Sequence, residues 1–137
     1  MRKSRKIVLV VEDHPPQLEA IRRVLLRMGL EVVPAGDGAA AKECLKGMVP
    51  DLICLELLLP DSSGYEICEF IRSSPAHREV PVLLLSDRAH PADRAHATEV
   101  GANAYLIKPW LDDQLRARIE TLLVQAGRGR ARAVGET

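Results

Sequence analysis

Asp51-Leu52-Ile53-Cys54-Leu55-Glu56 is an apolar run with a carboxylate at each end. A short run that is apolar on both faces is typical of a central strand in a parallel sheet. Leu57-Leu58-Leu59-Pro60 and then Gly64 follow it, and a proline and a glycine mark the loop after the strand. The sequence therefore predicts a buried strand over Leu52–Glu56 that carries Glu56 at its carboxyl end.

Short apolar runs alternate with helical patterns along the rest of the chain. Four runs predict further strands, over Ile7–Val11, Glu31–Ala35, Val82–Leu85 and Ala104–Ile107. Apolar residues at helical spacing predict helices between Pro15 and Gly29 and over Gly38–Lys46, Gly64–Ser73, Pro91–Val100 and Leu111–Gln125. Five strands alternating with five helices favour an α/β fold with a doubly wound parallel sheet. Pro34 cannot donate to a sheet ladder, so its strand is expected at an edge.

Composition excludes several classes of function. The chain has 137 residues, 47% of them hydrophobic, and a formal net charge of zero. This length is typical of one domain, and the neutral charge argues against direct binding of nucleic acid or an anionic membrane. No apolar stretch approaches the ~20 residues that span a bilayer. Ile7–Val11 is too short for the core of a signal peptide, so a cytoplasmic protein is expected.

The C-terminal residues differ in composition from the rest. Gly127 follows the last helical pattern and is predicted to end that helix. Residues 128–137 carry few apolar side chains. The sequence therefore predicts one domain over residues 1–126, and a flexible tail or the start of a linker, containing Arg and Gly, over residues 127–137.

The cysteines and histidines lack the spacing of a metal site. The cysteines fall at apolar positions, so buried and reduced thiols are expected. The histidines are expected to face solvent. These residues are Cys44, Cys54, Cys68, His14, His77, His90 and His96.

Polar groups follow four of the five predicted strands. Glu12 and Asp13 follow the first strand, and Glu56 ends the third. Ser86 follows the fourth strand, and Lys108 the fifth. The carboxyl ends of parallel strands form one edge of the sheet, where doubly wound folds bind their ligands. Carboxylates beside a lysine at this edge indicate a site for phosphate and metal.

These motifs together resemble the receiver domain of bacterial two-component response regulators, which has a flavodoxin-like fold with strand order 2-1-3-4-5 and acts in signal transduction and phosphorelay. The resemblance covers about Lys6 to Ala126. It rests on Val10-Val11-Glu12-Asp13, on Asp51-Leu52-Ile53-Cys54-Leu55-Glu56 with Pro60 and Gly64, on Pro81-Val82-Leu83-Leu84-Leu85-Ser86, and on Gly101-Ala102-Asn103-Ala104-Tyr105-Leu106-Ile107-Lys108-Pro109-Trp110.

The resemblance implies a magnesium site. Glu12 and Asp13 match the acidic pair that holds the ion in this family. Glu56 stands at the position of the phosphoacceptor aspartate, and the backbone carbonyl of Leu58 completes the implied ligands. Because Glu56 replaces the aspartate, magnesium binding is expected to be weak or absent.

Four further residues match the family's phosphoryl contacts and switch. Ser86 matches the hydroxyl that contacts the phosphoryl group, and Lys108 matches the lysine that does so. Tyr105 matches the aromatic switch residue. Pro109 matches a proline whose preceding peptide bond is cis.

The glutamate at position 56 predicts an atypical receiver that acts without phosphorylation. Its side chain is longer than aspartate by one methylene, on the order of 1.5 Å. Its carboxylate is expected to accept directly from Lys108 and Ser86, and so to act as a partial mimic of a phosphoryl group. The alternative is a decayed receiver that serves as a fixed protein-binding or dimerisation module.

An enzyme on the same fold is a third alternative that the sequence disfavours. The loop Glu12-Asp13-His14-Pro15-Pro16 has no glycine-rich cradle, and no nucleophilic cysteine follows the first strand. We therefore expect no catalytic residues. The partners expected from the resemblance are a histidine kinase, an effector domain or another receiver, including a second copy in a homodimer. They would bind the face formed by the fourth helix, the fifth strand and the fifth helix.

Overall fold

The computed structural model describes the backbone of residues 5–135 and the side chains of residues 5–127. Its strands are β1 (Ile7–Val11), β2 (Glu31–Ala35), β3 (Leu52–Glu56), β4 (Val82–Ser86) and β5 (Ala104–Ile107). Its helices are α1 (Pro15–Arg27), α2 (Gly38–Gly47), α3 (Gly64–Ser73), α4 (Pro91–Glu99) and α5 (Asp112–Gly135). The strands pair in parallel in the order β2-β1-β3-β4-β5. The predicted fold class is therefore confirmed.

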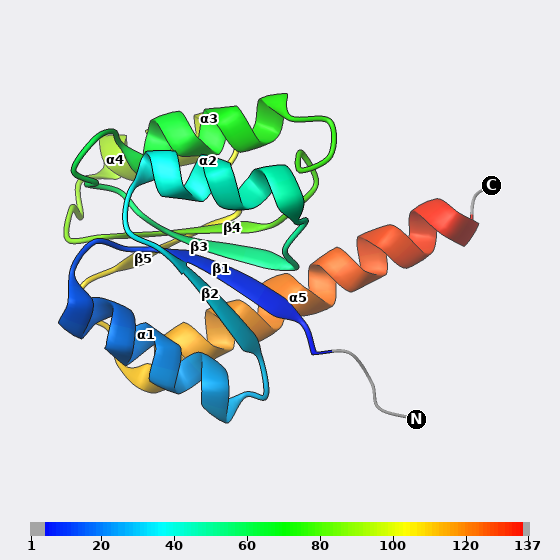
Figure 1. Cartoon of the computed structure of the whole chain (residues 1–137), viewed down its shortest axis with the longest axis horizontal. Helices are drawn as coiled ribbons and strands as arrows, with labels where there is room; N and C mark the ends of the chain where they lie inside the picture. Colours follow the sequence, from blue (N-terminus) through cyan, green and yellow to red (C-terminus); the bar gives the residue numbers. More distant parts are fainter. Residues whose placement is uncertain (1–4, 136–137) are drawn as a thin grey trace.

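Helices cover both faces of the sheet. Figure 1 shows α2, α3 and α4 on one face and α1 and α5 on the other. Two apolar clusters fill the two layers, one under each group of helices. Successive residues of β3 point to opposite faces, so Ile53 lies in the first cluster and Cys54 in the second. This explains why β3 has no polar residue before Glu56.

The edge position of β2 is also confirmed. Pro34 lies opposite Val10 of β1, and β2 has no strand on its other side. Its burial is incomplete, with Glu31 and Pro34 exposed. An edge strand tolerates a proline because only one of its two sides needs a complete set of hydrogen bonds.

The prediction that Gly127 ends the last helix was wrong. Helix α5 continues to Gly135, so most of the predicted flexible tail is helical. In Figure 1 this part of α5 extends beyond the sheet. A glycine inside a helix costs roughly 1 kcal/mol relative to alanine and does not by itself stop it. Residues 136–137 lie outside the described part, and the division of the chain at residue 126 stays a prediction.

The histidines do not all face solvent as expected. His77 is buried, with 6% of its surface exposed. Its Nδ1 atom lies 2.7 Å from the Ser74 hydroxyl, and its Nε2 atom lies 2.8 Å from the Met48 carbonyl oxygen. Both ring nitrogens therefore have partners, and burial costs the side chain little. The cysteines match expectation: Cys54 and Cys68 are buried and Cys44 half-buried, all as free thiols.

Arg72 joins the end of α3 to the loops before β4 and β5. Its Nε donates to the Gly101 carbonyl at 2.9 Å, and its Nη1 to the Val80 carbonyl at 2.7 Å. Its Nη2 donates to Asn103 Oδ1 at 2.7 Å, and that same oxygen accepts from the Val82 amide. One guanidinium thus satisfies acceptors from segments far apart in the sequence.

Replacing Arg72 by methionine should destabilise the fold by about 2–3 kcal/mol, because several partly buried acceptors lose a charged donor at once. Urea unfolding monitored by circular dichroism measures the change. Arg116→Met is the matched control, because Arg116 forms an ion pair with Glu120 on the exposed surface of α5 at 2.9 Å and its loss should change stability by less than about 0.5 kcal/mol. Equal losses in the two variants would contradict the assigned role of Arg72.

Candidate functional site

The carboxyl ends of the central strands bring three predicted side chains into contact. Glu12 follows β1, Glu56 ends β3, and Lys108 follows β5. Lys108 Nζ lies 2.7 Å from Glu56 Oε2 and 3.9 Å from Glu12 Oε1. The ammonium group therefore lies within ion-pair distance of both carboxylates.

Both carboxylates are removed from solvent. Glu12 is 3% exposed and Glu56 is 7% exposed. Among the described residues, Glu12 Oε1 and Glu56 Oε2 are buried atoms without a hydrogen-bond partner. Lys108 and Glu56 form a close ion pair. Two buried acceptors thus depend on a single cation for compensation.

Burial dominates the ionisation of the two glutamates. Desolvation, followed by repulsion from Glu56, raises the pKa of Glu12 to about 7. Desolvation also raises the pKa of Glu56, although the contact with Lys108 opposes this. The Glu12 carboxylate accepts one compensating bond, from the His14 amide at 3.2 Å.

Glu12 should make stability depend on pH. Its pKa is raised from 4.5 to about 7 in the folded state, so its contribution is complete below about pH 4.5 and is lost as the pH rises through about 7. Glu12→Gln should therefore stabilise the protein at pH 8 by about 1–2 kcal/mol and have little effect at pH 5.

Chemical denaturation at pH 5, 6, 7 and 8 measures this difference. Glu43→Gln is the matched control, because Glu43 is an exposed glutamate paired only with Lys46 on α2. A Glu12→Gln effect of the same size at pH 5 and pH 8 would contradict the assigned role of Glu12.

Ser86 lies at the same edge but does not contact Glu56. Its side chain is 1% exposed, and its hydroxyl oxygen accepts from the Arg88 amide at 3.0 Å. No hydrogen bond joins Ser86 to Glu56 in the described part of the chain, which differs from the expectation. The serine instead closes a local turn after β4, a common use of a hydroxyl at the start of a loop.

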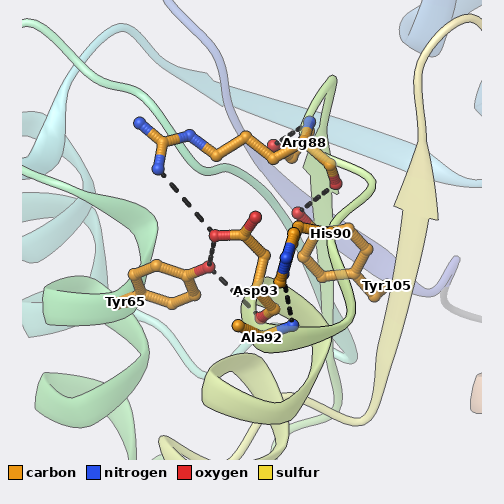
Figure 2. A network of polar contacts seen from close by, with 7 residues as sticks. Tyr65, Arg88, His90, Ala92, Asp93 and Tyr105 are labelled. Carbon is orange, nitrogen blue, oxygen red and sulfur yellow. Dashed lines mark hydrogen bonds and ion pairs between the residues drawn. The ribbon is translucent and has the colours of Figure 1, made fainter.

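Tyr105 points toward the loop after β4. It is half-buried, and its hydroxyl donates to the Arg88 carbonyl at 2.8 Å, as Figure 2 shows. Ser86 and Tyr105 therefore bond to the backbone amide and carbonyl of the same residue. The loop between β4 and α4 connects the site to the fifth strand.

The carboxylates at this edge are not arranged as a metal site. Within the described residues, no group of three or more His, Cys, Asp or Glu side chains is arranged to hold a metal ion. Asp13 is exposed, whereas Glu12 and Glu56 are buried. The Lys108 ammonium already lies close to both buried carboxylates. As arranged, these residues do not fit a divalent ion, which requires several oxygen ligands in fixed geometry.

The loop after β3 shapes the site. Leu58 is half-exposed and forms an antiparallel bridge with Ser63. A Cβ atom at Gly64 would lie 2.7 Å from the Glu56 carbonyl oxygen and 3.0 Å from the Leu57 Cα, so only glycine fits there. On the other side of the site, the Lys108–Pro109 peptide bond is cis.

Two residues near the site were missed by the sequence analysis. Asp61 accepts from the Gly38 amide at 2.8 Å and the Ala39 amide at 2.9 Å, which holds the loop after β3 against the start of α2. These bonds lower the pKa of Asp61. Tyr65 donates from α3 to α4. The chain has only two tyrosines, Tyr65 and Tyr105. This scarcity could have indicated from the sequence that Tyr65, like Tyr105, has a specific role.

A comparison with protein families decides the identity of this fold. The family model described as "Response regulator receiver domain" matches residues 8–120. The chain belongs to the receiver domain family of response regulators. Receiver domains are signalling modules of two-component systems rather than typical enzymes. In the described residues of this receiver, no helix is long and apolar enough to cross a membrane.

Curated relatives include transcriptional regulators. The receiver is 35% identical over 116 residues to the phosphate regulon transcriptional regulatory protein PhoB of Escherichia coli, covering 85% of this chain and 51% of PhoB. It is 32% identical over 123 residues to the DNA-binding response regulator MtrA of Mycolicibacterium smegmatis, covering 90% of this chain and 53% of MtrA. The chain thus spans about half the length of these relatives.

Solved receiver structures share the fold. The receiver domain of a signal transduction histidine kinase from Syntrophus aciditrophicus has a TM-score of 0.82 and 32% identity, covering 88% of this chain and 91% of that one. The receiver domain of the sensor histidine kinase PA1611 from Pseudomonas aeruginosa has a TM-score of 0.80 and 28% identity, covering 88% of this chain and 98% of that one. The PA1611 structure has a magnesium ion coordinated in its active-site cleft.

Proposed function

We propose that this chain is an atypical receiver that signals without phosphorylation, with Glu56 in place of the phosphoacceptor aspartate. The observation that carries the proposal is the 2.7 Å ion pair between Glu56 and Lys108. A carboxylate in this place supplies the lysine with the negative partner that a phosphoryl group would otherwise supply. Glu56 carries about one negative charge, against almost two on a phosphoryl group, so the mimicry is partial.

The chemistry of phosphoryl transfer also disfavours Glu56 as an acceptor. Transfer requires a nucleophile in line with the leaving group, with cations fixed around the phosphoryl oxygens. One extra methylene moves the carboxylate by about 1.5 Å. Misplacement of this order costs about 100-fold in rate. Glu56 is already paired with Lys108, so it would also have to give up that ion pair to react.

A second candidate function is a decayed receiver that serves as a fixed binding or dimerisation module. The observation that favours it is the hydrogen bond from the Arg88 amide to Ser86. A complete mimic would draw the Ser86 hydroxyl toward Glu56. Here the Ser86 hydroxyl accepts from the loop, so it does not make the contact with Glu56 that a complete mimic requires.

We further propose that magnesium is weakly held or dispensable, because Lys108 neutralises the same carboxylates. The proposed partners are a histidine kinase, an effector domain or another receiver, including a second copy of this chain. They would bind the face formed by α4, β5 and α5. The chain covers only 53% of MtrA, the reported relative described as DNA-binding, and we propose no nucleic-acid binding by this domain.

The wild-type protein should remain unlabelled by a phosphodonor. After incubation with acetyl phosphate and magnesium, intact-mass measurement should show no phosphoryl adduct on Glu56. Glu56→Asp should gain an adduct, because it shortens the side chain to the length of the family's acceptor. Glu56→Ala, which lacks a carboxylate, is the control for labelling elsewhere. A stoichiometric, base-labile adduct on wild-type Glu56 would contradict the proposal.

Association should distinguish the mimic from the fixed module. If the charge on Glu56 sets the state of the α4-β5-α5 face, Glu56→Gln should weaken self-association or partner binding by about tenfold, because one charge-assisted contact is lost. Glu56→Ala should weaken it more. Sedimentation velocity over a range of concentrations measures self-association. Equal association in all three proteins would favour the fixed module.

A further inference from the structure

Helix α4 is weakly attached to the sheet by apolar packing. It has nine residues, and Ala97 is its only buried residue in the described structure. The neighbouring helix α3 has ten residues, of which four are buried. A helix with little buried apolar surface opens more easily than its neighbours. The position of α4 must therefore depend strongly on the polar contacts at its N-terminal end.

Tyr65 of α3 makes one set of these contacts. Its hydroxyl lies 3.2 Å from the Asp93 carbonyl oxygen and 3.4 Å from Asp93 Oδ1, in the first turn of α4. Its ring meets the His96 ring edge-on, with centroids 4.3 Å apart and an interplanar angle of 80°. Tyr65 thus contacts α4 at two positions one turn apart.

Tyr105 of β5 reaches the same place from another element. Its hydroxyl donates to the Arg88 carbonyl, and the Arg88 guanidinium lies 3.8 Å from Asp93 Oδ1. Figure 2 shows Asp93 between the two tyrosines, with Arg88 extending above them. The Asp93 carboxylate is the point at which the two sets of contacts meet.

We propose that Tyr65 is a positioning residue that acts with Tyr105 as one clamp on the N-terminal end of α4. The clamp holds α4, and with it the face that α4 forms, in a single position. Loss of either hydroxyl frees α4 while the sheet and the other helices stay folded.

The Tyr65 contacts and the Tyr105 contacts both connect to residues of the functional site. Tyr65 follows Gly64, where an added Cβ atom would lie 2.7 Å from the Glu56 carbonyl oxygen. On the Tyr105 side, the amide of Arg88, whose carbonyl accepts from Tyr105, donates to Ser86. A rearrangement at either position would alter the contacts that hold α4. The clamp does not depend on Glu56 acting as a phosphoryl mimic, because none of its contacts includes the Glu56 carboxylate.

Hydrogen exchange of the whole chain tests the clamp. Tyr65→Phe and Tyr105→Phe each remove one hydroxyl and keep the ring. Each should speed exchange of the α4 amides by about 3- to 10-fold, which corresponds to the loss of one hydrogen bond. Exchange in β1, β3 and α1 should stay within twofold of wild type. Ser73→Ala is the matched control, because it removes a hydroxyl bond on α3 that reaches only the Glu69 carbonyl of the same helix.

The double variant tests whether the two tyrosines act together. A shared clamp predicts that its increase in α4 exchange is smaller than the product of the two single increases. A full product would show two independent tethers and would overturn the single clamp. So would α4 exchange within twofold of wild type in both single variants, or an equal increase throughout the sheet.

A phenol titration supplies a second readout, which reports on the surroundings of the Tyr65 hydroxyl. Burial raises the pKa of Tyr65, and the charges of Tyr105 and Asp93 raise it further. In Tyr105→Phe, Tyr65 is the only tyrosine left, so absorbance of the phenolate reports on it alone. Adding Asp93→Asn should move the midpoint down. An unchanged midpoint would overturn the Tyr65–Asp93 contact on which the clamp rests.

Discussion

The ammonium group of Lys108 determines the charge balance at the carboxyl edge of the sheet. Two buried carboxylates, those of Glu12 and Glu56, have no other cation within ion-pair distance in the described structure. Burial without a counterion would force such groups to bind protons. Burial and repulsion from Glu56 raise the pKa of Glu12, as expected where one cation compensates two buried acids only in part.

Glu56 and Ser86 differ in their contacts at this edge. The Glu56 carboxylate is paired with Lys108 at 2.7 Å. Ser86 is not recruited, because its hydroxyl bonds to the Arg88 amide in the adjoining loop. Under the proposed mimicry, the site would combine a lysine that already has an anionic partner with a serine that remains bonded to the loop.

The loop between β4 and α4 contacts both Ser86 and helix α4. Arg88 accepts from Tyr105 through its carbonyl and donates to Ser86 through its amide. Asp93 of α4 contacts both the Arg88 guanidinium and Tyr65. These polar contacts hold a helix that contributes a single buried residue to the core. A helix of this kind responds to small changes in its contacts, whereas α1 and α5 are held by several fully buried side chains.

Most of the fold was predictable because its signals are local. The alternation of apolar runs and helical patterns determined the number, type and order of the elements, and Pro34 determined which strand lies at an edge. The end of α5 was not predictable from Gly127, because one unfavourable residue competes with the favourable propensities of its neighbours. The burial of His77 depends on Ser74 and on the Met48 carbonyl, which is distant in sequence.

The sequence by itself determined which chemical groups lie at the carboxyl edge, because the ends of parallel strands must meet there. It therefore predicted that Glu12, Glu56, Ser86 and Lys108 would gather. Only the tertiary structure decided how they pair: Lys108 with the two glutamates, and Ser86 with the backbone of Arg88. The same holds for Arg72 and Tyr65, whose partners lie 6 to 31 residues away. Whether two groups from separate elements form a hydrogen bond depends on differences of a few tenths of an ångström in the distance between them. The order of residues in the sequence does not specify distances this finely.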